Sequence, residues 1–408
     1  MQIIYHHRIL ARDGMRVHVE EGVAALTRRG HAITMVGPGE TAGDGDHDGD
    51  ASADRSLTAR LGGLRHRLPK AVGEILEAGY NLKARRQLAA AIAGTRPAVL
   101  YERYNAFLTA GLWAKRRSGL PLLVEVNAPL CDERKSLDNL ALEPWARQME
   151  HAVWRGADAL FPVSDALAEH LRAAGVAEDR IHIMPNGVRL EHFSAEPSEA
   201  GKAALGLAGR RVVGFVGFVR PWHGLDRVLR AVAGLGDRDV HILIVGDGPA
   251  IPDLRRLTWE LGLDDQVTIT GVVPHDAVPG YLAAFDIALQ PDVTAYASPL
   301  KLFEYMAARC AVIAPDRANI REIVADGETA LLIAPQETGA LEAALVQYGG
   351  DDGGGRRAGR TVLQARWLTG ACRDPRQGDP LCDPPLSLSA GRWRQGARLS
   401  LPAASGPA

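Results

Sequence analysis

The sequence predicts an α/β protein with two domains, each built on a parallel β-sheet covered by helices. Three observations point to this class. Short apolar segments alternate with helical patterns, which is typical of strands buried in a parallel sheet. The alternation stops at a polar stretch near residue 190 and then starts again. The chain of 408 residues is also long enough for two hydrophobic cores of ordinary size.

The first predicted domain, residues 1–190, opens with a strand, a helix and a second strand. The strand over 2–5 leads into a loop, and the helix over about 17–29 is followed by a strand over 33–36. This order predicts Rossmann-like winding, in which ligands bind beyond the carboxyl ends of the strands. Asp13 and Gly14 lie in the loop at such an end, and this loop lacks the glycine pattern of a nicotinamide dinucleotide site.

Two polar segments follow. Residues 39–54 are rich in Gly, Ala and Asp, and without a closing bidentate glutamate they favour a solvated insertion over a calcium loop. Residues 60–86 combine apolar positions at helical spacing with seven Lys and Arg, which predicts an amphipathic helical region with a basic side. Such a side is either an ordinary solvated face or a support for an anionic membrane or acceptor.

Polar side chains stand at the ends of the next predicted strands. Arg103 follows one strand, and Glu125 and Asn127 follow the next. Strand ends of a parallel sheet line one crevice, so these side chains are candidates for a substrate site. Ser164 is a predicted N-cap after a further strand, and a last strand is expected over 181–184.

The second predicted domain, residues 191–347, repeats the alternation. Its strands are expected at 211–215, 241–245, 267–270, 286–289 and 311–314. The loop 216–224 follows the first of them and leads into a helix over 225–233. Arg220 and His223 lie in this loop, on the strand-end face.

One stretch, PDVTAYASPLKLFEYMA, has an unusual charge order. Ser298 is a predicted N-cap and Pro299 the first residue of a helix that runs to about Arg309. Lys301 falls in the first turn, where the helix dipole disfavours a cation unless an anion such as a phosphate binds there. Glu304 would then accept hydrogen bonds from sugar hydroxyls, and the alternative is a solvated Lys–Glu pair. Together with the loop cations, this stretch predicts a diphosphate ligand in a cleft between the domains.

Composition excludes several classes. A formal net charge of −2 gives no basic field for nucleic acid. Four scattered cysteines provide neither a disulfide framework nor a zinc site, and no cluster has metal-ligand spacing. No signal peptide or long apolar run is present, so we expect a cytoplasmic protein, with peripheral contact at the inner membrane face as an option.

The motifs RDG, YERYN, SDAL, PNGV, VGFVRPWHG, VGDGP and SPLKLFEYMA, in this order, resemble those of the GT-B glycosyltransferases of family 4. The resemblance covers roughly residues 1–345. It implies two Rossmann-like domains facing across a cleft and a retaining enzyme that uses a nucleotide sugar, such as a UDP- or GDP-sugar, without a cofactor. It implies that Glu304 binds the ribose, that the backbone after Gly271 meets the base, and that Lys301 and the 217–224 loop face the diphosphate.

The resemblance also assigns the remaining candidates. The donor site would comprise Gly14, Gly217, His223, Gly271, Val272, Tyr296, Ser298, Pro299, Leu300 and Glu304. Catalysis would fall to Arg220, Lys301, Asn127 and Glu125, and the acceptor side would include Asp13, His18 and Arg103. The chain departs from the family pattern at four positions: Tyr296 replaces a glutamate, Phe218 and His223 replace an arginine and a lysine, and Asn127 replaces a histidine.

The expected acceptor is a glycan or lipid-linked hydroxyl in polysaccharide synthesis. Two alternatives remain: a nucleotide-sugar epimerase of the same fold and an inactive sugar-nucleotide binder. Residues 348–408 are rich in Gly, Pro and Arg and lack apolar periodicity, so we expect a disordered or frame-shifted tail.

Overall fold

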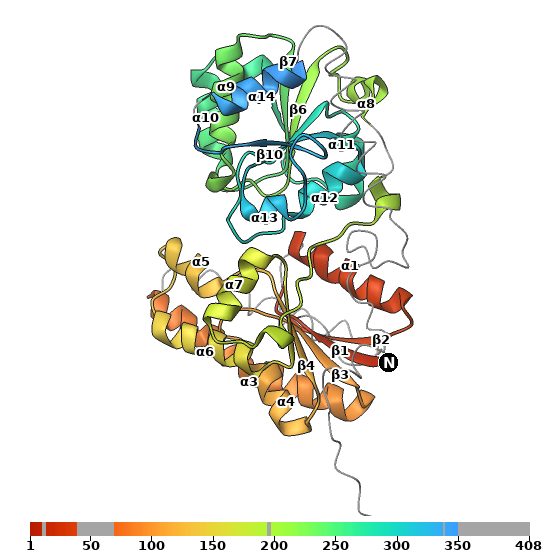
Figure 1. Cartoon of the computed structure of the whole chain (residues 1–408), viewed down its shortest axis with the longest axis vertical. Coiled ribbons are helices and arrows are strands. Elements are labelled where there is room, and N and C mark those ends of the chain that lie inside the picture. The colour runs from red at the N-terminus through yellow and green to blue at the C-terminus, as the bar shows by residue number, and fades with distance from the viewer. Residues whose placement is uncertain (10–13, 39–68, 194–196, 338, 350–408) are drawn as a thin grey trace, which may run out of the picture.

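The computed structural model describes residues 1–9, 14–38, 69–193, 197–337 and 339–349. Figure 1 shows two α/β domains, the first below and the second above. Each contains one parallel sheet, and the two sheets lie on either side of the predicted boundary at residue 190. Asp13 and residues 350–408 lie outside the described residues.

The first sheet has the strand order β2-β1-β3-β4-β5. Its strands are β1 (Gln2–His6), β2 (Ala32–Val36), β3 (Val99–Arg103), β4 (Leu122–Val126) and β5 (Ala159–Pro162). Its helices are α1 (Gly14–Arg28), α3 (Lys70–Thr95), α4 (Ala110–Ser118), α5 (Leu130–Ser136), α6 (Glu143–Gly156) and α7 (Asp165–Ala173). All neighbouring strands are parallel, and the order reverses between β1 and β3, where a doubly wound sheet opens a crevice.

Alternate residues of the strands supply two cores in this domain. Ile4 and Leu100 belong to the cluster formed with α3, α4, α6 and α7. Ile3 and Tyr101 point the other way and pack with α1. The side-chain period of two in a strand thus covers both faces of the sheet with helices.

The second sheet has the order β11-β10-β9-β6-β7-β8. Its strands are β6 (Arg211–Val216), β7 (Val240–Val245), β8 (Val267–Ile269), β9 (Ile287–Leu289), β10 (Ala311–Pro315) and β11 (Leu331–Ile333). Its helices are α8 (Glu199–Ala204), α9 (Leu225–Leu235), α10 (Ile251–Glu260), α11 (Val278–Leu282), α12 (Leu300–Ala307), α13 (Ala318–Arg321) and α14 (Ala340–Gly349). The switch in strand order lies between β6 and β9, so the loops after these two strands flank the expected ligand crevice.

Two local predictions are wrong. Helix α12 begins at Leu300 with Pro299 as its cap residue, and the Ser298 hydroxyl instead accepts a hydrogen bond from the Asn186 amide at 3.3 Å. The expected strand over 181–184 is reduced to one bridge between Leu160 and Ile181.

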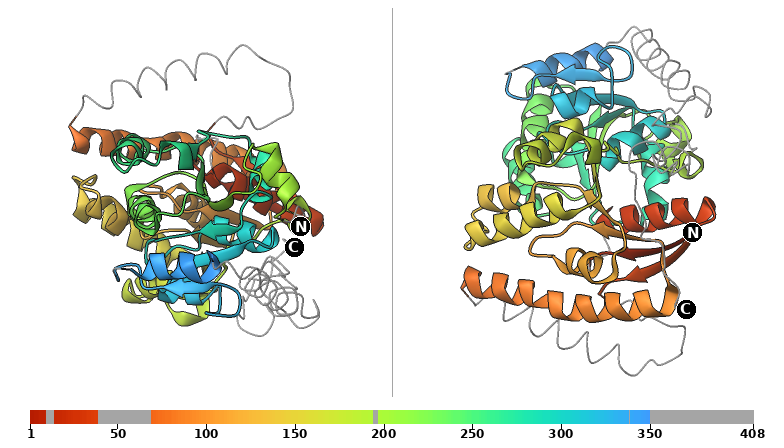
Figure 2. Two further views of the ribbon diagram at one scale, coloured as in Figure 1. Left: turned by 90° about the horizontal axis from the view of Figure 1, so that it is seen from above. Right: turned by 60° about the horizontal axis from the view of Figure 1, so that its bottom comes forward.

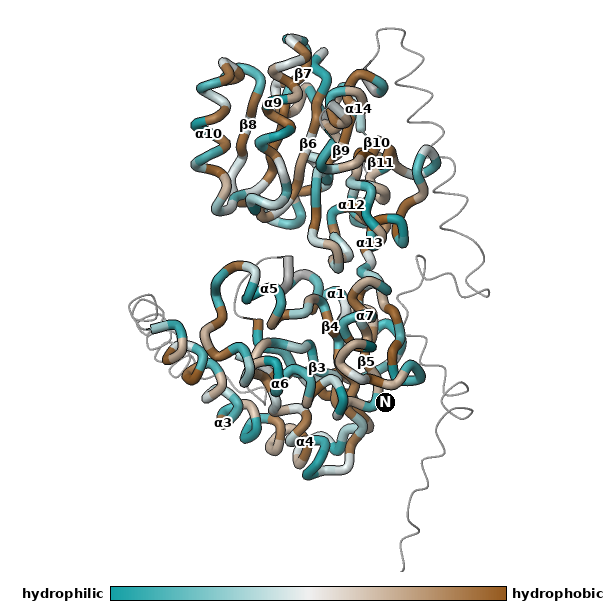
Figure 3. The backbone as a smooth tube through the Cα atoms, turned by 60° about the vertical axis from the view of Figure 1, so that its left-hand side comes forward, coloured by the Kyte–Doolittle hydropathy of each residue, from teal (hydrophilic) through white to brown (hydrophobic). Residues whose placement is uncertain are grey.

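The face of α3 that turns inward is not the apolar face that the sequence predicted. Figure 2 shows this long helix across the outer side of the first domain, and apolar positions recur along it in Figure 3. Yet Ile75 and Leu76 are 55% and 58% exposed, whereas Glu74 and Glu77 are buried. Glu77 accepts hydrogen bonds from two arginine side chains, and Glu74 from two backbone amides. Buried carboxylates need such partners, so these bonds decide which face of α3 turns inward.

Candidate active site

The loop 217–224 is fixed tightly beside the switch point of the second sheet. The Gly217 amide donates to the Val245 carbonyl at 2.9 Å, and the Val219 amide donates to the Asp247 carbonyl at 2.8 Å. A Cβ on Gly246, whose φ is +145°, would lie 2.1 Å from the Gly217 carbonyl oxygen. Glycine is therefore required where the two loops cross, and the crossing gives the loop 217–224 a rigid base.

Two side chains of this region carry the positive charge. The Lys301 ammonium lies 3.8 Å from the centre of the Phe215 ring, next to Gly217. The Arg220 guanidinium lies over the rings of Phe218 and Trp222, at 4.6 and 5.1 Å from their centres. Both cations belong to segments that flank the switch point of the second sheet.

His223 is not a third cation. Burial, together with the positive charges of Lys301 and Arg220, lowers the pKa of His223 to about 2. Its Nδ1 accepts a hydrogen bond from the Arg220 backbone amide at 3.1 Å. The predicted convergence of three cations is therefore wrong: the neutral imidazole fixes the backbone of the loop, and two cations remain.

Lys301 and Glu304 lie one turn apart on α12 and influence each other. Burial lowers the pKa of Lys301 to about 7, and the Glu304 carboxylate opposes this shift. Burial likewise raises the pKa of Glu304 to about 7, and the Lys301 ammonium opposes that shift. Near neutral pH both groups therefore change their charge easily when a ligand brings a new charge or hydrogen bond.

The loop before α12 is held by the first domain. The Ser164 hydroxyl donates to the Tyr296 carbonyl at 2.7 Å, while it accepts from the Leu167 amide at 3.0 Å. The Asn186 side chain donates to the Ser298 carbonyl. Residues more than 100 positions apart in the sequence thus position the N-terminus of α12.

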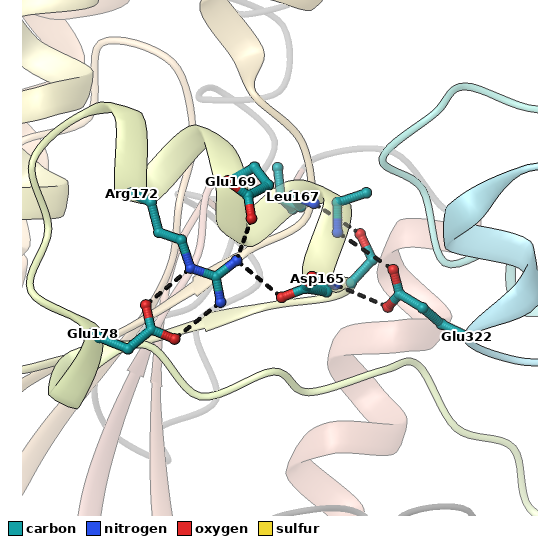
Figure 4. Close-up of polar contacts among 8 residues, drawn as sticks. Asp165, Leu167, Glu169, Arg172, Glu178 and Glu322 are labelled. Carbon is teal, nitrogen blue, oxygen red and sulfur yellow. Dashed lines mark hydrogen bonds and ion pairs between the residues drawn. The ribbon is translucent and has the colours of Figure 1, made fainter.

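A second contact between the domains caps helix α7. Figure 4 shows the Glu322 carboxylate, from the end of α13, facing the first turn of α7. It accepts hydrogen bonds from the backbone amides of Asp165 at 2.8 Å and Ala166 at 3.3 Å. On the same helix, Arg172 pairs with three carboxylates and ties α7 to the following turn.

On the side of the first domain, Glu125 is the centre of a buried polar cluster. Its Oε1 accepts from Arg103 at 2.5 Å, from His18 at 2.8 Å and from Asn127 at 2.6 Å. Two buried tyrosine hydroxyls donate to its Oε2. Burial by itself would raise the pKa of Glu125, but His18 and Arg103 lower it more strongly and hold it well below its usual range. Glu125 is therefore ionised and orients its neighbours, Asn127 among them.

The remaining candidates have the following places. Gly14 is the first residue of α1, rather than a loop residue as expected. Gly271, with φ of +75°, follows β8, and the next residue, Val272, is 82% exposed. Leu300 begins α12 and Pro299 caps it.

The structure therefore groups the candidates in two sets. One set surrounds the loop 217–224 and the start of α12, and the other surrounds Glu125. Within the described ranges, no hydrogen bond, ion pair or ring contact joins Glu125 to the set around α12. The sequence did not predict that Asn186 would bond to the start of α12 or that Glu322 would cap α7, although the PNG turn marked the position of Asn186.

Among the residues that the structure describes, no group of His, Cys, Asp and Glu could hold a metal ion. The helices of the described ranges include none that is long and apolar enough to cross a membrane.

Comparison with known proteins gives matches along most of the chain. Residues 13–187 match the family model of the glycosyl transferase 4-like domain, and residues 210–351 match that of glycosyl transferases group 1. The α-D-kanosaminyltransferase of Streptomyces kanamyceticus is 30% identical over 229 residues, which cover 54% of this chain and 59% of that protein. The D-inositol 3-phosphate glycosyltransferase of Nocardia farcinica is 34% identical over 203 residues, 47% of this chain and 45% of that protein. The matches thus span about half the length of these relatives.

Solved structures share the fold. Anabaena HepE in complex with UDP-glucose gives a TM-score of 0.65 at 20% identity, covering 90% of this chain and 94% of that one. WaaG, a glycosyltransferase involved in lipopolysaccharide biosynthesis, gives a TM-score of 0.64 at 14% identity, covering 97% and 100%. At such identities the likeness shows two facing Rossmann-like domains, the GT-B fold.

Proposed function

The chain belongs to the GT-B glycosyltransferases of family 4, and we propose that it moves a sugar from a nucleotide-sugar donor to an acceptor hydroxyl with retention of configuration. The observation that carries this proposal is the pair of cations at the switch point of the second sheet. Arg220 and Lys301 flank the crevice where a doubly wound sheet binds nucleotides, and Glu304 follows one turn later.

The donor would bind along the second domain. Its diphosphate would lie between Arg220, Lys301 and the N-terminus of α12, whose dipole favours an anion. Glu304 would accept hydrogen bonds from the ribose, and the backbone of Gly271 and Val272 would meet the base. Structures of HepE hold UDP and UDP-glucose, which makes a uridine nucleotide the first donor to test here.

In the reaction, the bond between the sugar and the diphosphate would break as the acceptor hydroxyl approaches from the same face. Negative charge grows on the leaving diphosphate, and Arg220 and Lys301 would stabilise it. The acceptor proton would leave with the departing phosphate oxygen. Asn127 has no basic atom, so its part would be to orient the acceptor, held in place by Glu125.

The acceptor is proposed from two observations. Relatives named 2-deoxystreptamine glucosyltransferase and D-inositol 3-phosphate glycosyltransferase favour a small hydroxylated ring as the acceptor. The exposed face of α3 favours an acceptor at an anionic membrane, because Ile75, Leu76 and Leu82 are exposed beside Lys83 while the carboxylates turn inward.

Vesicle sedimentation separates the two acceptor classes. A membrane site predicts binding to phosphatidylglycerol vesicles, weak binding to phosphatidylcholine, and loss of binding in the double variant Ile75→Glu, Leu76→Glu. Val346→Glu, an equally exposed apolar position on α14, serves as the control. No sedimentation with either lipid would leave the small-molecule acceptor.

Thermal melting with UDP, GDP, ADP and their sugar conjugates tests the donor site. A ligand at 100 times its Kd stabilises the folded chain by about 2.7 kcal/mol, so the true donor shifts Tm clearly. The shift should vanish in Glu304→Ala. An epimerase would convert the donor without releasing nucleotide, whereas a transferase releases it only with an acceptor. No shift with any nucleotide would contradict the proposal.

A further inference from the structure

We propose that Phe218 and Trp222 are positioning residues that hold the Arg220 guanidinium ready for the donor diphosphate. The proposal rests on the proposed function and deepens it, because it identifies the side chains that orient one of the two cations facing the donor diphosphate. The guanidinium carbon lies 4.6 Å from the centre of the Phe218 ring and 5.1 Å from that of the Trp222 ring. We call these three residues the arginine clamp.

In the described part of the chain, the charge of Arg220 is not neutralised by a carboxylate. Arg220 is exposed, and among the described residues no acidic side chain pairs with its guanidinium. Arg172 offers a contrast, since it pairs with three carboxylates. A carboxylate would neutralise Arg220 and compete with a phosphate, whereas an aromatic ring attracts the cation and leaves its charge available.

Lys301 is held in the same way. Its ammonium lies 3.8 Å from the centre of the Phe215 ring, at the end of the strand that leads into the loop. The His223 ring, neutral and 5.1 Å from the Phe215 ring, fixes the Arg220 backbone. Arg220 in the loop and Lys301 beside it thus each lie over an aromatic ring, and among the described residues no carboxylate forms an ion pair with either of them. The Glu304 carboxylate, one turn along α12, acts on Lys301 through its charge alone. Two cations placed in this way suit an anion site.

The exposure of Phe218 supports a role beyond packing. Phe218 is 53% exposed, although the loop that carries it is fixed by backbone hydrogen bonds on both sides. Burial therefore does not account for an aromatic residue at this position. Stacking restricts the rotamers of Arg220 before the ligand arrives and reduces the entropy that binding would otherwise lose.

The test is a double-mutant cycle read out as the Kd for UDP and GDP, measured by calorimetry on the full chain. Phe218→Leu should raise the Kd of the nucleotide that wild type prefers by roughly two- to fivefold, the usual strength of an exposed cation–π contact. Phe218→Tyr should restore the wild-type Kd. On the Arg220→Ala background, Phe218→Leu should change the Kd no further.

Trp222→Leu, which removes the other ring of the clamp, should also raise the Kd, and Trp259→Leu is its matched control. Trp259 lies on α10 and is 73% exposed, so its loss should leave the Kd unchanged. A loss in Phe218→Leu that persists on the Arg220→Ala background would overturn the clamp, because the ring would then act on the donor directly. An unchanged Kd in both Phe218→Leu and Trp222→Leu would also overturn it. A wild-type chain that binds neither nucleotide would instead refute the proposed function on which the clamp rests.

Discussion

Replacing Lys301 with methionine should stabilise the free protein while weakening donor binding. Burial lowers the pKa of Lys301 to about 7 from an ordinary value of 10.5. The unfolded chain therefore binds a proton more readily than the folded chain between these two pH values. The free energy of unfolding must then rise as pH rises through this window, and Lys301→Met should lose that rise.

The size of the effect follows from the same two pKa values. A fall from 10.5 to about 7 corresponds to at most about 5 kcal/mol of destabilisation at neutral pH. Lys301 is only partly buried, so we expect about 1–3 kcal/mol of added stability in Lys301→Met. Glu304 should respond by taking up a proton, because the loss of the ammonium raises its pKa further. Removal of one charged contact to the diphosphate should raise the Kd for UDP about 10- to 100-fold.

Urea unfolding at pH 7 and pH 9, together with calorimetric titration of UDP, measures both effects. Lys83→Met, at an exposed lysine of α3, is the control. It should neither raise the free energy of unfolding nor raise the Kd for UDP. A Lys301→Met protein that is less stable than wild type and binds UDP equally well would refute both the burial argument and the site.

Three further predictions concern the surroundings of the site. Glu322→Ala removes two hydrogen bonds between the domains and should increase the radius of gyration measured by X-ray scattering. The free energy of unfolding, measured with urea, should fall by only about 1 kcal/mol. Gly246→Ala should destabilise the chain by about 2–4 kcal/mol, since its Cβ would collide with the Gly217 carbonyl; a wild-type urea midpoint would contradict the loop crossing. His223→Gln should leave the pH profile of UDP affinity between pH 5 and 9 unchanged, because burial and two nearby cations keep the pKa of His223 at about 2; a lost step near pH 6.5 would show a charged imidazole.

Most strands of this fold could be predicted because they are short apolar runs bounded by polar or turn-forming residues, although β11 was not among the expected strands. The expected strand at 211–215 is extended by one residue, and that at 241–245 begins one residue earlier. Once the strands were placed, the crossing rules of parallel sheets put the loop 216–224 at a ligand crevice. The periodic apolar positions of α3 misled for a physical reason: distant arginines stabilise Glu77 in the interior, and a local pattern contains no information about them.

The same limit explains the errors at the candidate site. Ser298 has the chemistry of an N-cap, but its hydroxyl is taken by Asn186, a residue 112 positions earlier. From the sequence, His223 counts as a candidate cation. In the fold, burial and the charges of Lys301 and Arg220 lower its pKa and keep the imidazole neutral. Local rules identify which residue types can act, whereas their partners are chosen by the tertiary fold.

These long-range partners explain how one site can arise from two domains. The second domain supplies the cations and α12, yet the loop that aims α12 is bonded to the first domain through Ser164 and Asn186. The Ser164 hydroxyl makes two bonds at once: its lone pair accepts from the Leu167 amide at the start of α7, and its proton is donated to the Tyr296 carbonyl. If the domains separate, Tyr296 loses this donor, and the N-terminus of α12 loses the support that fixes its direction. A ligand bound at the N-terminus of α12 would therefore be held best when the first domain is in contact with the loop 291–299.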